Sequence, residues 1–283
     1  MSKLEKIYNL RNEALYQANS ITDAILRYEE ALLNLADTKS LAHAGRLAKY
    51  REEITNKKLL AKLRMYFNEI YRLINTNYKD NKFLIIGRTK SLISADDKII
   101  KLLSENMSLD LFRDTYGFRV HLFGNNSDEL ISKCYSIMND IIKNFTKKGF
   151  TLCEAEAAKD TKGFVPSEHP SVLVPSETGI SQDFLYGVKD YIFTPKKNGY
   201  QSLHAVFRAN TGECFEIQVR TLDMHIYADT GEASHDRFKS ERNTCSFDRS
   251  KICLPDYQVT QDGKVYDYAG LEEATEIYRR KSL

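Results

Sequence analysis

The first third of the chain is poor in the residues that interrupt regular structure. No proline occurs before Pro166, and Gly45 is the only glycine among the first 86 residues. Since proline and glycine are the residues that most often break helices, this region can hold long ones. Apolar residues recur there at spacings of three and four, as in Leu59, Leu63, Tyr66, Ile70 and Leu73. The spacing predicts two or three amphipathic helices over residues 1–78.

The chain also lacks long apolar runs and paired cysteines. It contains no stretch of 18 apolar residues, and it opens without an apolar segment, so neither a membrane helix nor a secretory signal is predicted. We therefore expect a cytoplasmic protein with no membrane partner. The five cysteines are odd in number and include no C-x-x-C pair, which disfavours a disulfide framework or a zinc ribbon. Reduced thiols that fill apolar space fit this pattern best.

Charge is unevenly distributed, although the net charge is only +2. Residues 39–101 contain 15 Lys or Arg and 6 Asp or Glu, so the rest of the chain is acidic. A basic region of this kind indicates a polyphosphate or a nucleic acid as partner. A solvated helix face explains the charge density equally well.

Short apolar runs and amphipathic stretches alternate after residue 80. Strands are predicted at 82–87, 115–123, 150–155, 202–209 and 213–220, and helices at 94–104, 128–147, 222–239 and 271–280. Residues 156–188 contain three of the five prolines and read as a long loop, and Asn210-Thr211-Gly212 reads as a hairpin turn.

This order of elements predicts an α+β fold, with a mixed β-sheet covered by helices. Three regions follow: an N-terminal helical region at 1–80, a domain with the mixed sheet at 81–240, and a tail at 241–283.

A first polar cluster lies where the strand at 82–87 gives way to a helix. Arg88, Lys90, Ser94 and Lys98 could converge there on free backbone N–H groups at the helix start. Such a place suits phosphate oxygens. Basic residues beside a strand are also commonly solvated, so this cluster alone does not identify a site.

A second cluster surrounds the strand at 115–123. Asp114 lies at the entry to that strand, where a carboxylate can hold Mg²⁺ against phosphate oxygens, or simply cap a turn. Arg119 lies inside the apolar strand, and a buried arginine requires an anionic partner.

A third cluster runs from Lys189 to His204. Lys196 and Asn198 belong to a Pro-Lys-Lys-Asn-Gly turn, and the aromatic side chain of Tyr200 follows at once. Ser202 and His204 come next, on one face of a strand. Lysine suits phosphate, tyrosine can stack on a base, and histidine can bind a phosphate oxygen or move a proton. The turn alone does not explain this density of functional side chains.

A fourth cluster lies on the strand at 213–220. Glu216, Gln218 and Arg220 alternate with apolar residues and therefore share one face, which resembles the wall of a site more than a solvated edge. His225 and His235 follow on a helix, too far apart for the short spacing of zinc ligands.

Together and in this order, the four clusters resemble the synthetase domain of the RelA/SpoT homology family, which makes the alarmones ppGpp and pppGpp. The resemblance covers residues 82–239 and implies a nucleotidyltransferase-like synthetase domain at 81–240. Its motifs are Arg-x-Lys-x-x-x-Ser-x-x-x-Lys, Asp-x-x-x-x-Arg, Lys-Asp-Tyr-Ile-x-x-Pro-Lys-x-Asn-Gly-Tyr-x-Ser-x-His and Glu-Ile-Gln-x-Arg-Thr-x-x-Met-His.

The resemblance implies a role for each cluster. Arg88, Lys90, Ser94 and Lys98 would bind ATP, and Asp114 and Glu216 would be the catalytic carboxylates that bind Mg²⁺. Tyr200 would stack on the acceptor base. The remaining acceptor-binding residues would be Lys196, Asn198, Ser202, His204, Gln218 and Arg220, supported by Arg119 and Lys189.

The implied reaction transfers the β,γ-pyrophosphate of ATP to the 3′-hydroxyl of GDP or GTP and releases AMP. Glu216 would help to deprotonate the attacking hydroxyl. Residues 1–80 contain His43 alone among histidines, so the hydrolase domain of the long relatives is not expected, and the resemblance is to a stand-alone synthetase.

Two alternatives stay open. Some stand-alone relatives are toxins that pyrophosphorylate the 3′-CCA end of tRNA, and the basic segment 39–101 would suit RNA. The tail 241–283 or a neutralising partner protein could then block the toxin, and the chain could also form a homo-oligomer. The other alternative is an inactive nucleotide-binding module, which the presence of both Asp114 and Glu216 disfavours.

Overall fold

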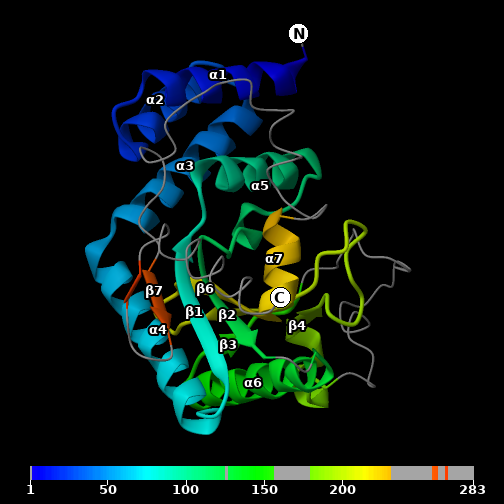
Figure 1. The fold of residues 1–283 in the computed structure, drawn as a ribbon. Coiled ribbons are helices and arrows are strands. Elements are labelled where there is room, and N and C mark those ends of the chain that lie inside the picture. Colours follow the sequence, from blue (N-terminus) through cyan, green and yellow to red (C-terminus); the bar gives the residue numbers. More distant parts are fainter. Residues whose placement is uncertain (1, 125–126, 156–178, 231–256, 261–264, 267–283) are drawn as a thin grey trace. The chain divides into compact units, whose positions relative to one another are not determined.

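The structure is a computed structural model that describes residues 2–124, 127–155, 179–230, 257–260 and 265–266 (Figure 1). Packing divides the chain into two compact units that alternate along the sequence. Unit 1 comprises Met1–Lys62, Thr89–Thr115 and Phe238–Leu254, and unit 2 comprises Leu63–Arg88, Tyr116–Arg237 and Pro255–Leu283. This division follows different lines from the predicted ranges 1–80, 81–240 and 241–283, which stay a prediction.

The N-terminal region is built from four helices, so the prediction of two or three over residues 1–78 is wrong. They are α1 (Lys3–Gln17), α2 (Ile21–Leu33), α3 (Thr38–Thr55) and α4 (Lys57–Asn77). The segments between these helices contain no proline or glycine, and each ends in a polar residue that caps the next helix. The side chains of Ser20 and Asp37 accept hydrogen bonds from the first turns of α2 and α3, and Asn56 Oδ1 does the same for α4.

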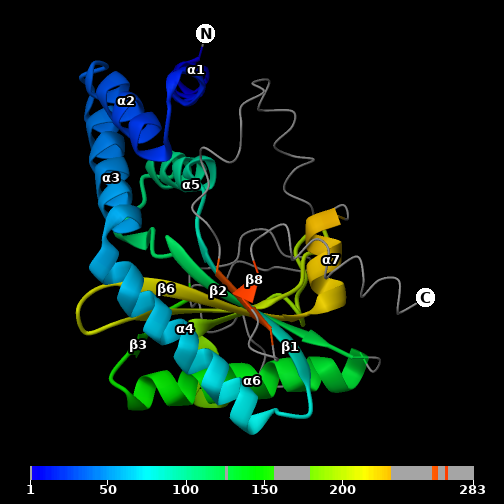
Figure 2. The ribbon, with the colours of Figure 1, turned by 60° about the vertical axis from the view of Figure 1, so that its left-hand side comes forward.

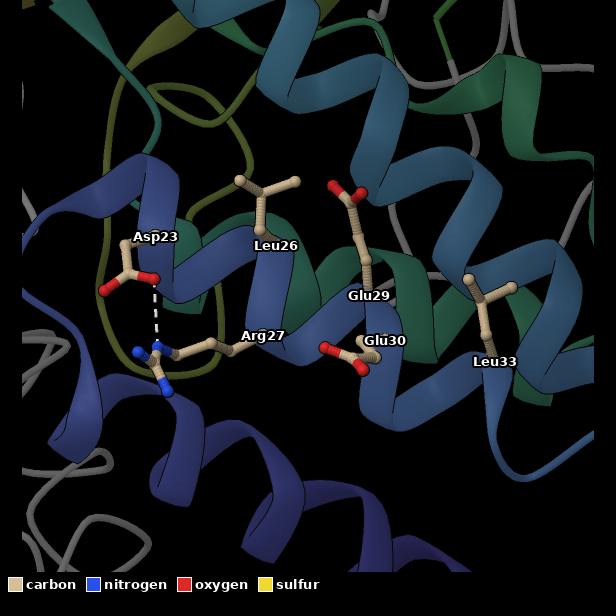
Figure 3. Close-up of a pocket in the computed structure, with 6 residues that line it drawn as sticks. All are labelled: Asp23, Leu26, Arg27, Glu29, Glu30 and Leu33. Carbon is tan, nitrogen blue, oxygen red and sulfur yellow. Dashed lines mark hydrogen bonds and ion pairs between the residues drawn. The ribbon is translucent and has the colours of Figure 1, made fainter.

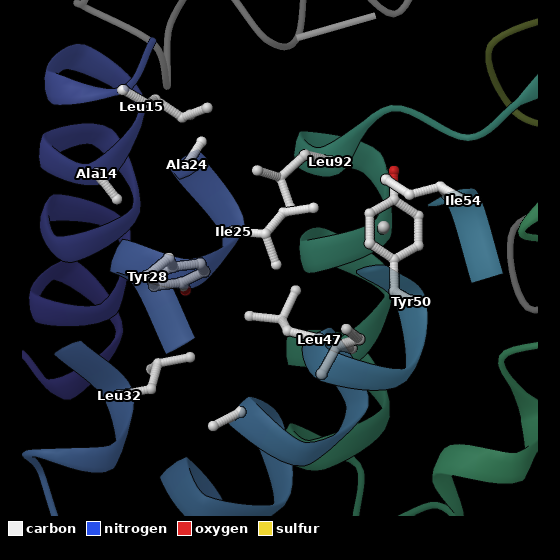
Figure 4. Close-up of a cluster of buried hydrophobic side chains, with 14 of the residues drawn as sticks. Ala14, Leu15, Ala24, Ile25, Tyr28, Leu32, Leu47, Tyr50, Ile54 and Leu92 are labelled. Atoms are coloured by element: carbon white, nitrogen blue, oxygen red, sulfur yellow. The ribbon is translucent and has the colours of Figure 1, made fainter. Parts of the chain in front are cut away.

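Unit 1 has its own apolar core, formed by α1, α2, α3 and α5 (Leu92–Ser104). Figure 4 shows the side chains of this core, in which α2 supplies Ile25 and Leu32, α3 supplies Leu47 and Ile54, and α5 supplies Leu92. Each of these helices carries apolar residues at spacings of three and four, which creates the buried stripe. Helix α5 begins two residues earlier than predicted, because Ser91 accepts the capping bond from the backbone N–H of Ser94.

Unit 2 contains most of a mixed sheet, which confirms the predicted α+β fold. Its strands are β1 (Lys82–Thr89), β2 (Tyr116–Phe123), β3 (Thr151–Leu152), β4 (Val188–Asp190), β5 (Leu203–Arg208), β6 (Cys214–Thr221), β7 (Tyr257–Thr260) and β8 (Val265–Tyr266). The strand order is β3-β5-β6-β2-β1-β7-β8, and β4 pairs with β5. Strands β2 and β6 are parallel, whereas β5 and β6 form the predicted antiparallel hairpin.

The predicted strands of the central region are confirmed, with one much shorter than expected. The strand predicted at 150–155 has only two residues, as β3, and strands β4, β7 and β8 were not predicted. The predicted loop at 156–188 is described only from residue 179, where a 3-10 helix at Gln182–Gly187 leads into β4. Beyond residue 230, the rest of the predicted helix 222–239 and the whole predicted helix 271–280 lie outside the described residues.

The two faces of the sheet in unit 2 are covered differently. Helix α6 (Ser127–Lys147) and the later part of α4 lie on one face, and α7 (Leu222–Thr230) lies on the other (Figure 2). Phe118 and Phe215 point toward α4 and α6, where they contact Phe67 and Phe145. Because strand side chains alternate between faces, the residues next to Phe118 and Phe215 point toward the face that α7 covers.

Candidate active site

The α7 face of strand β6 carries a row of polar side chains. Glu216, Gln218 and Arg220 alternate with the buried Ile217 and Val219, which point into the core under α6. The amide Nε2 of Gln218 donates to Glu216 Oε2 at 2.6 Å. The alternation seen in the sequence therefore does place these side chains on one face, in contact with one another.

Strand β5 brings a histidine to the same carboxylate. In the β5–β6 hairpin His204 lies opposite Gln218, and its Nδ1 is 3.0 Å from Glu216 Oε1. On the other side of the ring, the Tyr200 hydroxyl is 2.9 Å from His204 Nε2. A carboxylate accepts only, so Nδ1 carries the proton, and the neutral ring accepts from Tyr200 at Nε2.

The environment of His204 favours this neutral form. Burial lowers its pKa most, and Lys196 and Lys189 lower it further, while Glu216 acts in the opposite direction. Strand β2 completes the row, since Arg119 Nε donates to Gln218 Oε1 at 3.2 Å. Both oxygens of Glu216 thus accept hydrogen bonds from side chains that are themselves held by further partners.

The connection from β4 to β5 carries four of the predicted residues, Lys196, Asn198, Tyr200 and Ser202. Asn198 Oδ1 accepts a hydrogen bond from the backbone N–H of Tyr200, and Gly199 has a φ of 79°. This positive φ favours glycine, and a Cβ at Gly199 would also lie 2.8 Å from the ring of Tyr227 in α7. The Asn198 side chain therefore shapes the turn, whatever it contacts in a bound nucleotide.

Lys196 lies against two aromatic rings, only one of which was predicted to belong to the site. Its Nζ is 4.6 Å from the ring centre of Tyr191 and 4.9 Å from that of Tyr200, within the range of cation–π attraction. Tyr191 is missed in the sequence because an aromatic residue in an apolar stretch looks like core. Its neighbour Asp190 is buried and accepts hydrogen bonds from Tyr135 and from two backbone N–H groups, and burial raises the pKa of its carboxyl.

Two predicted acceptor-binding residues lie deeper than the others. Ser202 is fully buried, and its hydroxyl donates to the backbone carbonyls of Leu203 and Val219. Arg220 is 1% exposed, with its guanidinium carbon 5.6 Å from the centre of the Tyr200 ring. Ser202 is therefore bonded to the strand backbone, and Arg220 forms the buried end of the polar row.

Two buried histidines hold Arg220 in place. Its Nη2 donates to His225 Nδ1 at 2.7 Å, and its Nε donates to His121 Nε2 at 3.4 Å. The two imidazole rings stack with their centres 4.0 Å apart. Burial, reinforced by the charge of Arg220, lowers the pKa of His225 to about 2, and burial also holds the pKa of His121 well below its ordinary value. Both rings are therefore neutral acceptors for the guanidinium.

Two more predicted residues of unit 2, Arg88 and Lys189, lie on strands of the same sheet. Arg88 belongs to β1, and its aliphatic carbons lie over Gly117 in β2, where an added Cβ would be 3.8 Å from Arg88 Cγ. Lys189 belongs to β4, and its backbone lies opposite His204.

The remaining predicted residues belong to unit 1. Lys90 Nζ donates to Asp114 Oδ2 at 2.6 Å, with both side chains largely buried. Ser94 and Lys98 are one turn apart on α5 and partly exposed, and the Ser91 hydroxyl donates to Ser94 Oγ at 3.1 Å. The structure therefore groups the predicted residues in two sets, one in each unit, and the pairing of Asp114 with Glu216 around a metal stays a prediction.

A shallow hollow of about 520 Å³ occurs on helix α2 in unit 1 (Figure 3). Its lining residues are Asp23, Leu26, Arg27, Glu29, Glu30 and Leu33. Asp23 is paired with Arg27, and Glu29 with Arg51, so three of its four charged side chains already have protein partners. None of the predicted site residues lines the hollow, and its side chains suggest no ligand.

Three further properties concern the described residues as a whole. No three His, Cys, Asp or Glu side chains gather closely enough there to hold a metal ion on their own. The helices among them include none that is both long and apolar enough to cross a membrane. The described cysteines Cys134, Cys153 and Cys214 are free thiols.

Fold and site together define an α+β protein whose sheet face presents a hydrogen-bonded carboxylate beside an aromatic platform and basic side chains. Residues 175–243 match a family described as "Region found in RelA / SpoT proteins". The chain is therefore similar to RelA/SpoT proteins over these residues, and the resemblance predicted from the motifs is confirmed.

Several curated proteins are similar to parts of the chain. The probable chloroplastic GTP diphosphokinase RSH3 of Oryza sativa subsp. japonica is 31% identical over 159 residues, which are 56% of this chain and 16% of the relative. A GTP pyrophosphokinase of Haemophilus influenzae is 47% identical over 57 residues, or 20% of this chain and 8% of the relative. The chain thus matches less than a fifth of the length of these relatives.

Similar stretches also occur in relatives with another printed activity and in a solved structure. A guanosine-3′,5′-bis(diphosphate) 3′-pyrophosphohydrolase of Spiroplasma citri is 51% identical over 55 residues, which are 19% of this chain and 7% of the relative. The small alarmone synthetase 1 of Bacillus subtilis, solved with its product pppGpp, is 19% identical, with 71% of this chain and 84% of that chain covered and a TM-score of 0.36. At that TM-score the structural likeness adds nothing to the assignment.

Proposed function

We propose that this protein is a pyrophosphokinase that transfers the β,γ-pyrophosphate of ATP to the 3′-hydroxyl of GDP or GTP, producing ppGpp or pppGpp and AMP. One observation carries the proposal: Tyr200, His204 and Gln218 form a hydrogen-bonded chain that converges on the Glu216 carboxylate. The match to the RelA/SpoT region supports the same assignment.

The acceptor nucleotide would bind along the β5–β6 row. Tyr200 presents a ring that is backed by Arg220, and a nucleobase can stack on such a ring. Lys196 would interact with the acceptor phosphates, with Arg119 and Gln218 holding the row in place. The Glu216 carboxylate would then take the proton of the attacking 3′-hydroxyl, because its two oxygens are fixed by His204 and Gln218.

The donor nucleotide would bind to Arg88, Lys90, Ser94 and Lys98. Cationic side chains at the start of a helix suit the triphosphate, and they would neutralise the charge that develops as the bond between the α- and β-phosphates breaks. The reaction requires the two nucleotides to be held in line, with no covalent enzyme intermediate.

A divalent cation, for which we propose Mg²⁺, fits the carboxylates of Asp114 and Glu216. Both are hard oxygen ligands, and two protein carboxylates are typical for a magnesium site that is completed by water and substrate phosphates. When bound, the ion would offset negative charge on the transferred group. Lys90, which contacts Asp114, would hold that carboxylate in position.

A parallel assay tests the proposal. The purified protein is incubated with β-labelled or γ-labelled ATP and Mg²⁺, and receives GDP, GTP, GMP or bulk tRNA as the acceptor. We expect label on GDP or GTP, with an equal amount of AMP. Label on tRNA alone would replace this proposal with the RNA-modifying toxin, and transfer to none of these acceptors would favour an inactive binding module.

We further propose that the protein makes the alarmone without degrading it. Residues 1–80 contain one histidine, and His43 is engaged with a buried aspartate in the helical core. Labelled ppGpp incubated with the protein and a divalent cation should stay intact. Release of pyrophosphate from it would contradict this part of the proposal.

A further inference from the structure

Helix α3 presents a polar stripe in an otherwise apolar interface. His43, Arg46, Tyr50 and Glu53 follow one another at spacings of three, four and three residues, which places them on one side of the helix. The first three are buried. Each of the four bonds to segment 89–115, the part of unit 1 that carries Lys90, Ser94, Lys98 and Asp114.

The first contact of the stripe fixes the backbone of Lys90. The Tyr50 hydroxyl donates to the Lys90 carbonyl oxygen at 2.6 Å. The Lys90 backbone N–H donates to the carbonyl of Thr115 at 2.8 Å. Both backbone polar groups of Lys90 are therefore bound, and the tyrosine ring behind them is 1% exposed. The direction in which the Lys90 side chain points therefore depends on the hydrogen bond from Tyr50.

Two further contacts bracket Asp114. On one side, Arg46 Nη2 donates to the carbonyl of Phe112 at 3.1 Å, and its guanidinium lies 4.1 Å from the centre of the Phe112 ring. On the other side, the Thr115 hydroxyl donates to Glu53 Oε2 at 2.6 Å. The chain is thus held on both sides of Asp114 by side chains from one helix.

The last contact holds helix α5. His43 Nε2 is 2.6 Å from Asp96 Oδ1, and Arg11 Nη1 donates to Asp96 Oδ2 at 3.0 Å. All three side chains are at most 2% exposed. Asp96 is a buried residue of α5, whereas Ser94 and Lys98 are partly exposed. The buried ion cluster therefore fixes the orientation of the helix that carries them.

We propose that α3 positions the donor-nucleotide half of the site, with Tyr50 and Glu53 as positioning residues for Lys90 and Asp114. The inference rests on the proposed function, because it takes the segment 89–115 as the part that binds ATP. It gives the N-terminal helices a role in substrate affinity. If α3 had a purely structural role, substitutions in it would change stability and would alter the KM values for ATP and for the acceptor to the same extent.

The test compares Tyr50→Phe with a matched control, Tyr78→Phe. Each substitution removes one hydroxyl in a part-buried hydrogen bond and keeps the ring, and Tyr78 donates to Asp140 at 2.8 Å within unit 2. We expect Tyr50→Phe to raise the KM for ATP about fivefold, the effect of one lost hydrogen bond of ~1 kcal/mol. The KM for the acceptor should stay the same in both variants. Equal KM values for ATP in the two variants would overturn the proposal.

A second pair of variants tests Glu53. Glu53→Ala removes the acceptor for the Thr115 hydroxyl, whereas Glu53→Gln keeps an oxygen in its place. We expect the alanine variant to bind ATP more weakly and the glutamine variant to recover most of the affinity. Loss of ATP affinity to the same extent in both variants would contradict positioning through Thr115.

Direct binding separates this inference from the proposed function. ATP affinity is measured by calorimetric titration of the full chain, without any acceptor, and the unfolding temperature of each variant is recorded. If the wild type transfers label to no acceptor, the proposed function fails. Weaker ATP binding by Tyr50→Phe, with unchanged binding by Tyr78→Phe, would still support the role of α3. Unchanged binding in both would refute it.

Discussion

The two units hold their polar side chains by different means. In unit 2, the row around Glu216 is fixed by strand register, since His204 and Gln218 lie opposite each other in a short hairpin. In unit 1, Lys90 and Asp114 are fixed by helix packing, through side chains of α3 that lie far away in the sequence. The first arrangement is local, and the second depends on a tertiary contact.

This difference predicts how each group of polar residues responds to substitutions nearby. Hydrogen bonds of a ladder hold a strand residue even when a neighbouring side chain changes. A residue that is positioned by a remote helix moves when that helix shifts. The row around Glu216, our proposed acceptor row, should therefore be sensitive mainly to its own residues. The proposed donor set around Lys90 and Asp114 should also be sensitive to the core beneath α3.

The largest effect is expected at the centre of the strand-built row. Glu216→Gln keeps an oxygen for one hydrogen bond but removes the negative charge and the ability to accept a proton. Turnover should fall about 10²–10³-fold, as for loss of a general base, with the circular dichroism spectrum unchanged. Glu213→Gln, three residues away on the hairpin, is the control and should retain activity. Wild-type turnover by Glu216→Gln would show that the catalytic carboxylate lies elsewhere.

The next effect tests the core beneath α3. Leu47 is fully buried in unit 1, and Leu47→Ala should lower the free energy of unfolding by about 2–5 kcal/mol. Below the unfolding temperature, the KM for ATP should rise more than the KM for the acceptor. Urea titration and steady-state kinetics measure both quantities. Leu33→Ala, at a half-exposed position of α2, should change neither, and a parallel rise of both KM values for Leu47→Ala would remove the distinction between the units.

A pH effect is expected from the histidines behind the acceptor row. His225 has an ordinary pKa of 6.5 when unfolded and about 2 when folded, so its neutral form stabilises the protein above pH 6.5. That stability is lost as pH falls from 6.5 toward 2, because the unfolded state takes up the proton first. Between pH 7 and pH 5 the loss is about 2 kcal/mol for one such group.

His225→Asn sharpens this expectation. Asparagine offers Arg220 an oxygen in place of Nδ1 and does not titrate, so the variant should lose less stability between pH 7 and pH 5 than the wild type. Urea unfolding at the two pH values gives the comparison. Identical losses for both proteins would show that the acid sensitivity comes from other groups.

The smallest effect is expected at the edge of the acceptor row. Tyr200→Phe keeps the ring on which a base would stack and removes only the hydrogen bond to His204. The KM for the acceptor should rise at most about fivefold, since a net hydrogen bond is worth ~1 kcal/mol. Tyr66→Phe, which loses a bond to Glu213, serves as the control. A loss as large as that of Glu216→Gln would mean that the hydroxyl takes part in the chemistry.

The grouping of the polar side chains around Glu216 could be predicted because it follows from the pattern of neighbouring residues. Period-two alternation places Glu216 beside Gln218, and the turn at Asn210–Gly212 fixes the strand that pairs with it. The contact between His204 and Glu216 also depends on the register of the hairpin. The sequence predicts the hairpin but not which residues lie opposite each other. The support by His121 requires the parallel pairing of β2 with β6, a contact between segments about 100 residues apart.

The support of the donor set could not be predicted in the same way. Polar residues at helical spacing, such as Arg46 and Glu53, are typical of a solvated helix face. Their partners are a backbone carbonyl and a hydroxyl, groups too common in a sequence to be recognised as partners. The extra break before α4 was missed because Asn56 provides the cap without glycine or proline. Strand β7 was missed because its pairing partner, β1, lies more than 160 residues earlier in the chain.

The alternation of the two units along the chain has a consequence for biosynthesis. Helices α1–α3 emerge from the ribosome well before Asp96 of α5, so the nascent chain must expose Arg11 and His43 to solvent until their partner is made. A proteolytic fragment that ends near residue 80 would keep Arg11 and His43 and lose the carboxylate between them. We therefore expect the helical unit to become protease-resistant only after residue 115 has left the exit tunnel, when β1 has also been synthesised.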